Sequence, residues 1–165
     1  MEYYFGESCI MRYKWDKLLE TGNSIIDNQH RQLFSALNEL TEAHGSGNGS
    51  AELERVLDFL NSYVVKHFGD EEKIMRQIGY SDYGIHKLYH ESFKTTVSDL
   101  TRQLLEGNDS EEFILQVGTT IADWLNNHIK GDDFKLAAHL QSLEVLTGKV
   151  ENCRVPFYKW CLSIG

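Results

Sequence analysis

The middle of the chain carries the sequence HFGDEEKIMRQIGYSDYGIHKLYH, which begins at His67 and ends at His90. In an α-helix, residues four positions apart lie on one face, about a turn apart. His67 and Glu71 form one such pair, and His86 and His90 form another. The GYSD segment between the two pairs is typical of a break between helices. Two neighbouring helices that each present two metal-type ligands would supply half of a metal cage.

The length and composition of the chain predict one domain. With 165 residues, 41% of them hydrophobic, the chain can build one ordinary core. The formal net charge of -9 argues against nucleic acid or an anionic membrane as a partner, because both attract positive surfaces. No apolar run reaches the roughly 18 residues needed to span a bilayer, and residues 1–8 lack the pattern of a signal peptide. We therefore expect a cytoplasmic protein.

The cysteines of the chain are Cys9, Cys153 and Cys161. They form neither a Cys-x-x-Cys pair nor an even set, so we expect free thiols in a reducing compartment. A redox role for Cys153 and Cys161, near the carboxyl terminus, is the alternative interpretation.

Apolar residues recur every three or four positions in four parts of the chain, which predicts four amphipathic helices. A glycine-rich loop at 45–50 separates the first two helices, and residues 79–82 and 107–110 separate the others. The second helix is expected over about residues 51–78, and a further short helix is expected over 134–143. No part of the sequence alternates apolar and polar residues over a useful length, so no strand is predicted.

The short connections predict antiparallel neighbours. The expected fold class is therefore all-α: an antiparallel up-down-up-down four-helix bundle with an N-terminal arm and a C-terminal extension. The bundle and arm would occupy residues 1–143, and the apolar residues of the arm, 1–22, would pack on the bundle. The extension, residues 144–165, either covers the end of the bundle or docks on a protein partner.

Five histidines fall on the apolar stripes, so that every predicted helix contributes at least one. They are His30, His67, His86, His90 and His128. A single histidine on an apolar face is usually a hydrogen-bonded core residue, but burying five without a metal would leave costly unpaired polar groups. We therefore expect these five to bind metal. His44 and His139 lie outside the stripes and are expected to be exposed.

The two glutamates that follow His67 point in different directions. Glu71 lies on the ligand face. Glu72 points about 100° away from it, so we expect this side chain in solvent or in a surface ion pair.

An aspartate near the end of the fourth helix is a further candidate ligand. Asp133 lies five residues after His128, about 140° further round an ideal helix. It can reach the same metal only where the helix ends or loosens, which Gly131 permits. On position alone, Asp132 is the rival ligand.

With these residues the chain resembles the bacterial hemerythrins. The matching pieces are Trp15, Thr21-Gly22, Ile26-Asp27-Asn28-Gln29-His30, His67-Phe68-x-x-Glu71-Glu72, Gly79-Tyr80, His86-x-x-x-His90, and Trp124-Leu125-x-x-His128-Ile129 with Asp133. They cover roughly residues 13–140. The departures are Ser81, where the family often has proline, and the chain after about Leu143.

The resemblance implies a non-haem di-iron centre, bridged by oxide or hydroxide, that binds molecular oxygen reversibly. By this resemblance, one iron would be held by His86, His90 and His128. The other iron would be held by His30 and His67, and Glu71 and Asp133 would bridge the two. Asp27, Phe34, Phe68 and Trp124 would surround the centre, or would serve only as a helix cap and core filler.

Counting the implied ligands leaves one free position in two six-coordinate irons. The iron with three histidines is full, so the free position lies on the iron of His30 and His67. Oxygen is expected there, in a pocket walled by Phe34 and Trp124.

Three classes of function are compatible with these ligands. The first is an oxygen-binding protein used for storage, delivery or sensing. The second is a di-iron enzyme acting on peroxide or nitric oxide, and the third is a sensor that signals through the C-terminal extension. The sequence contains no Glu-x-x-His motif of the di-iron carboxylate proteins, so a non-enzymatic oxygen binder is favoured. The same ligands also suit manganese or zinc.

Overall fold

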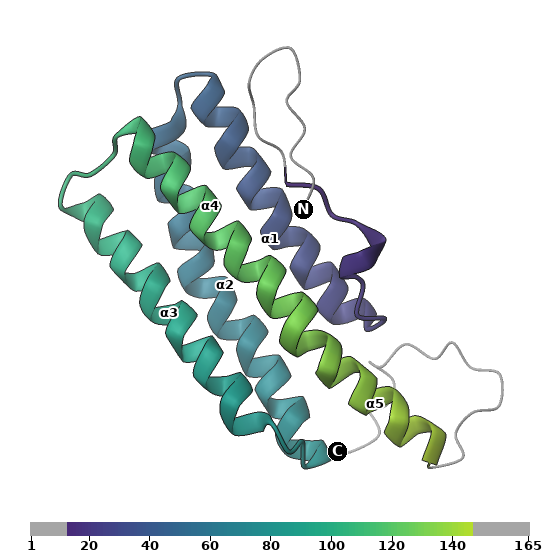
Figure 1. Ribbon diagram of the computed structural model, residues 1–165. Coiled ribbons are helices and arrows are strands. Elements are labelled where there is room, and N and C mark those ends of the chain that lie inside the picture. The colour runs from purple at the N-terminus through teal and green to yellow at the C-terminus, as the bar shows by residue number, and fades with distance from the viewer. Residues whose placement is uncertain (1–12, 147–165) are drawn as a thin grey trace.

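The computed structural model describes residues 13–146, and most of them are helical. Four long helices pack side by side, each antiparallel to the next in sequence (Figure 1). They are α1 (Ser24–Gly45), α2 (Gly49–Ile78), α3 (Tyr83–Leu105) and α4 (Glu111–His128). A short 3-10 helix, η1 (Lys17–Leu19), comes before them, and the chain continues after α4 into η2 (Ile129–Asp133) and α5 (Phe134–Leu146). The predicted four-helix bundle is confirmed.

Local capping chemistry explains where the helices begin and end. The side chain of Asn23 accepts hydrogen bonds from the backbone N–H groups of Ile25 and Ile26, at 3.0 and 3.3 Å, at the start of α1. Ser110 does the same for Phe113 in α4. At the end of α2, Gly79 adopts a left-handed conformation with φ 64°, which glycine tolerates best. The turn signals in the sequence therefore lie within about two residues of the helix boundaries, although Gly49 and Ser50 of the expected loop already belong to α2.

The chain after α4 differs from the expectation of a separate short helix. A π-helical segment, η2, joins α4 directly to α5, and α5 continues to Leu146, three residues beyond the expected end. The two helices therefore form one nearly continuous rod along the bundle (Figure 1).

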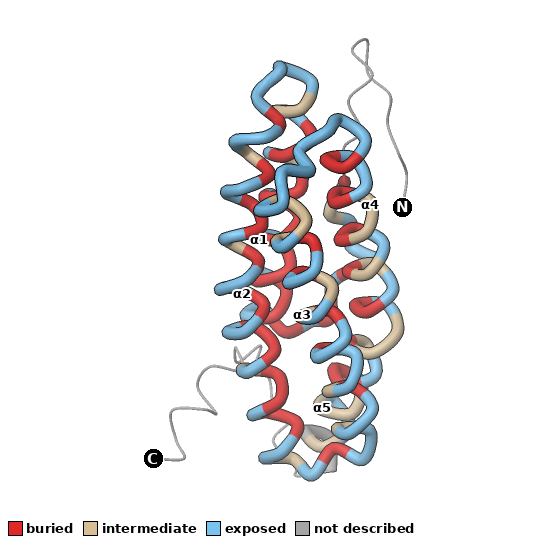
Figure 2. Tube along the Cα trace, turned by 90° about the vertical axis from the view of Figure 1, so that its left-hand side faces the viewer, coloured by how far each residue is buried: buried red, intermediate tan, exposed pale blue. Residues whose placement is uncertain are grey.

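The buried residues lie on the inner faces of the helices (Figure 2). A large apolar cluster fills most of the bundle, and a small one of Met75, Tyr80 and Leu136 closes the end near α5. His67 and Glu71 precede Met75 on α2 by about two turns and one turn respectively, so the predicted ligands lie between the two clusters. Within residues 13–146, no helix is long and apolar enough to cross a membrane.

The N-terminal arm is described from Tyr13 onward. Tyr13 and Leu19 are buried, and the side chain of Asn38 exchanges two hydrogen bonds with the backbone of Tyr13, at 2.8 and 2.9 Å. This part of the arm packs on the bundle as expected, except that Leu18 is 72% exposed. Residues 1–12 and 147–165 lie outside the described residues, and so do all three cysteines and most of the C-terminal extension.

The two remaining histidines correct an expectation. Both His44 and His139 are half-buried rather than exposed. His139 packs its ring against Tyr80, with 5.3 Å between the ring centroids, because α5 continues the rod past the small apolar cluster.

Candidate metal centre

The described structure brings the seven predicted ligands together from all four long helices and η2. His30 comes from α1, and the others follow on α2, α3, α4 and η2: His67, Glu71, His86, His90, His128 and Asp133. Every one of these side chains is buried. The sequence therefore identified residues that converge in space.

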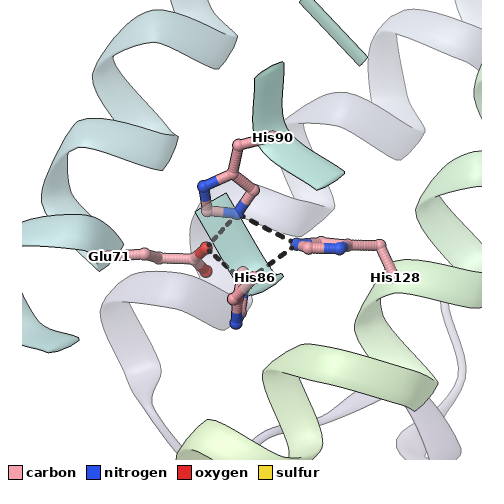
Figure 3. Close-up of side chains that lie close together, drawn as sticks. All are labelled: Glu71, His86, His90 and His128. Atoms are coloured by element: carbon pink, nitrogen blue, oxygen red, sulfur yellow. Dashed lines mark hydrogen bonds and ion pairs between the residues drawn. The ribbon is translucent and has the colours of Figure 1, made fainter. Parts of the chain in front are cut away.

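Three imidazoles and one carboxylate form the first group (Figure 3). His128 Nε2 lies 3.2 Å from His86 Nε2 and 3.1 Å from His90 Nε2. Glu71 Oε2 lies 3.2 Å from His90 Nε2. The donor atoms of this group all lie within 4.8 Å of one another, so one ion could contact all four.

The second group, which contains His30 and His67, lies next to this three-histidine group and shares Glu71 with it. The other oxygen of Glu71, Oε1, lies 3.6 Å from His67 Nε2. Asp133 Oδ2 lies 3.1 Å from His30 Nε2, while Asp133 Oδ1 lies 3.2 Å from His128 Nε2. Each carboxylate therefore presents one oxygen to each group, which is the arrangement of a bridging ligand.

The π-helical turn explains how Asp133 reaches the centre. The backbone N–H of Phe134 bonds to the carbonyl of Ile129, five residues earlier, so residues five apart lie on one face here. Asp132 instead points to the rim. Its Oδ2 lies 3.7 Å from the outer nitrogen of His128, Nδ1, and its Oδ1 lies 3.3 Å from Lys135 Nζ.

Several buried atoms of the centre have no hydrogen-bond partner in the protein. They include both oxygens of Glu71, both oxygens of Asp133 and both ring nitrogens of His30. Buried polar atoms without a partner are costly, but carboxylate oxygens and imidazole nitrogens are the ligands that iron, manganese and zinc accept. The donor set thus fits metal ions.

Comparison with known proteins identifies the family. A sequence model of the Hemerythrin HHE cation binding domain matches residues 21–140. The chain belongs to the hemerythrin family. Its sequence is 35% identical to a bacteriohemerythrin of Stenotrophomonas maltophilia over 119 residues, which are 72% of this chain and 75% of that protein.

Other hemerythrins give the same result. A hemerythrin-like protein of Naegleria gruberi is 35% identical over 123 residues, 74% of this chain and 89% of that protein. A crystal structure of wild-type hemerythrin superposes with a TM-score of 0.65 at 30% identity, covering 76% of this chain and 95% of that chain. The hemerythrin family binds a di-iron centre, and this chain has a buried cluster of histidines and glutamate suited to one. Family and fold support a di-iron oxygen-binding protein in general.

The histidines and carboxylates of this hemerythrin centre shift each other's pKa values. Burial lowers the pKa of His86, but the nearby carboxylates of Asp133 and Glu71 outweigh burial and raise that pKa to about 9. In His67, burial outweighs the charge of Glu71 and lowers the pKa to about 4. Burial alone would raise the pKa of both carboxyl groups, and yet the histidines, including His128 beside Asp133, hold both below their usual range. Both carboxylates are therefore ionised at neutral pH, and metal must displace a proton from His86.

Glu72 corrects the expectation of a solvated side chain. It is buried, and its Oε1 lies 3.4 Å from His90 Nδ1. Its Oε2 faces Arg76 and Lys87 at 3.7 and 3.8 Å. The expected ion pair therefore exists, but its carboxylate is buried. The signal that could have revealed this role is chemical, because a metal-bound imidazole usually donates its outer N–H to an acceptor.

The residues expected around the hemerythrin centre divide into three roles. Phe68 stacks on His90, with ring centroids 3.9 Å apart and an interplanar angle of 6°. Trp124 stacks on His128 at 4.3 Å, so it lies beside the three-histidine group rather than beside His30 and His67. Asp27 accepts hydrogen bonds from the loop before α1, including one of 2.8 Å from the backbone N–H of Thr21, and serves as a cap.

Phe34 lies on the two-histidine side, as expected. It follows His30 by one turn of α1 and packs against the edge of Trp15, with centroids 5.6 Å apart. Trp15 in turn lies 6.1 Å from the His30 ring. The arm therefore covers the two-histidine side of the centre with aromatic surface.

Proposed function

We propose that this protein holds two irons and binds molecular oxygen reversibly, for storage, delivery or sensing. His86, His90 and His128 would hold one iron. His30 and His67 would hold the other. Glu71 and Asp133 would bridge the two, with an oxide or hydroxide as a further bridge. Ferrous iron in this site supplies the electrons that oxygen binding requires.

One observation carries the proposal. Glu71 and Asp133 each turn one oxygen to the three-histidine group and the other oxygen to the two-histidine group. Neither carboxylate has a hydrogen-bond donor that would explain its burial. Two cations, one in each group, would contact all four carboxylate oxygens.

The composition of the ligand set favours binding over catalysis. Five imidazoles and two carboxylates form a nitrogen-rich set, whereas the di-iron carboxylate proteins use Glu-x-x-His motifs and more glutamates. Anionic ligands stabilise the high-valent iron that substrate oxidation needs. Phe68 and Trp124 cover His90 and His128 with apolar rings, which keeps water away from the three-histidine side.

Metal analysis combined with visible spectra tests the proposal. The purified protein should contain two irons per chain. Its absorption bands should appear in air and vanish under argon, through repeated cycles. One zinc per chain and no colour would exclude the proposed function. Two irons with rapid consumption of peroxide or nitric oxide would favour an enzyme instead.

A cytoplasmic location is part of the same proposal. The sequence holds three cysteines without paired spacing, which supports a reducing compartment. Cell fractionation tests it, and recovery of the protein with an oxidising compartment would contradict it.

A further inference from the structure

The outer nitrogen of His67 has a partner of a different kind from those of His90 and His128. His67 Nδ1 lies 2.8 Å from the side-chain oxygen Oε1 of Gln29. Gln29 is buried on α1, directly before His30. The inner nitrogen of His67, Nε2, faces Glu71. Gln29 therefore contacts the ring on the side opposite the proposed iron.

A charged group fixes which end of the Gln29 amide faces the ring. The amide nitrogen of Gln29, Nε2, lies 3.1 Å from Asp70 Oδ2. An ionised carboxylate can only accept hydrogen bonds, so the NH₂ end of the amide must face Asp70. Lys66 Nζ donates to the same oxygen at 2.8 Å and holds the carboxylate in place. The amide oxygen is consequently left to face His67.

The orientation of the amide determines the tautomer of His67. An amide oxygen accepts but cannot donate, so the single proton of a neutral imidazole must lie on Nδ1. The lone pair then lies on Nε2, which faces the centre. We propose that Gln29 is a positioning residue that fixes this tautomer of His67, and that Asp70 acts through Gln29. The inference rests on the proposed function only in naming iron as the ion that uses the lone pair.

His67 differs in this respect from two histidines of the three-histidine group. The outer nitrogens of His90 and His128 face carboxylates, Glu72 at 3.4 Å and Asp132 at 3.7 Å. The outer nitrogen of His67 faces a neutral amide. A carboxylate makes an imidazole a stronger electron donor than an amide does, so His67 should donate more weakly than His90.

Replacing Gln29 tests the tautomer directly. In the Gln29→Met variant, with Gln32→Met as the control on the exposed face of α1, nitrogen NMR of ¹⁵N-histidine-labelled protein should show the proton of His67 leaving Nδ1 for a mixture of both nitrogens. The spectra are recorded on the metal-free protein, so this result does not depend on iron. Iron affinity, measured by competition with a chelator, should fall about 10- to 100-fold. An unchanged tautomer would overturn the proposal, even where affinity falls.

Replacing Asp70 tests the second step. Asp70→Asn removes the charge that orients the amide, and Asp58→Asn removes an equal charge elsewhere on the exposed face of α2. Only Asp70→Asn should allow the proton of His67 to leave Nδ1. The double variant Gln29→Glu/Asp70→Asn reverses the donor and the acceptor in the hydrogen bond between residues 29 and 70, and it keeps an acceptor oxygen against His67. It should restore the tautomer and lower the reduction potential of the iron-loaded protein. If the double variant does not restore the tautomer, Asp70 forms only a surface ion pair with Lys66 and does not act through Gln29.

These outcomes separate the inference from the proposed function. A protein that keeps the Nδ1 tautomer only with Gln29 but binds no iron would retain the inference about His67 and lose the oxygen-binding proposal. A protein that binds two irons but whose His67 tautomer does not depend on Gln29 would lose the inference about His67 and leave the oxygen-binding proposal intact.

Discussion

His128 and Asp133 are five residues apart, and yet His128 Nε2 lies 3.2 Å from Asp133 Oδ1. An α-helix would turn the two side chains about 140° apart. The π-helical turn from Ile129 to Asp133 brings them onto one face. The neighbouring residue, Asp132, is consequently left at the rim of the centre, against the outer nitrogen of His128.

This geometry predicts opposite results for two adjacent substitutions. Asp133→Asn replaces one of the two proposed bridging oxygens with an NH₂ group that cannot bind metal, so one group loses a ligand and the bridge is lost; the purified variant should contain fewer than two irons per chain and lack the oxygen-dependent bands. Asp132→Asn is the matched control and should keep two irons. Iron is counted by elemental analysis after equal loading. Two irons in both variants would exclude Asp133 as a bridge.

A second prediction concerns the backbone of the same turn. Gly131 lies outside the left-handed region, and a Cβ added there would meet no atom within 4 Å. Gly131→Ala should therefore stabilise the metal-free protein by about 0.4–1 kcal/mol, because alanine restricts the unfolded chain. Gly79 has equally open space but a φ of 64°, so Gly79→Ala should destabilise by about 1 kcal/mol. Urea unfolding measures both. A destabilised Gly131→Ala would mean that the turn needs glycine.

The helices could be predicted from sequence because their signals are local. The apolar stripe of α1 and the cap at Asn23 lie within a few residues of each other, and each alone points to a helix. The sequence also allowed Asp133 to be a ligand, on the condition that the helix loosens. Gly131 was expected to permit this loosening; the structure places it within the π-helical turn, but not in the left-handed conformation that requires glycine.

The surroundings of the ligands could not be predicted, because they depend on how helices rotate against each other. Glu72 lies off the ligand face of α2, and periodicity alone assigns it to solvent. It is buried because His90 of α3 meets that flank. Trp124 lies on the apolar stripe of α4, but nothing local indicates that it stacks on His128 rather than on the two-histidine side.

A third prediction concerns the metal-free protein. The centre joins α1, α2, α3 and α4, and without metal it buries two carboxylates that lack hydrogen-bond partners. Metal bound only by the folded state stabilises it, by about 4 kcal/mol at a free concentration 1,000 times Kd. Thermal melts with and without a strong chelator should therefore differ by many degrees. The Asp133→Asn variant is the control and should respond less. Coincident melts of the wild type would contradict a structural role for the metals.

The last prediction asks which side of the centre oxygen reaches. Phe34 packs against Trp15, which lies beside His30, whereas Trp124 stacks on His128, so the two aromatic rings cover the two-histidine side and the three-histidine side respectively. The free coordination position implied by the ligand count lies on the two-histidine iron. Opening that side with Phe34→Leu should admit water and speed irreversible oxidation to the ferric form in air by about tenfold, which equals about 1.4 kcal/mol of barrier. Trp124→Leu, which opens the other side, should change the rate much less. Loss of the bands is timed after iron content has been matched to the wild type. A faster loss in Trp124→Leu than in Phe34→Leu would place the oxygen pocket beside His128 and reverse the assignment.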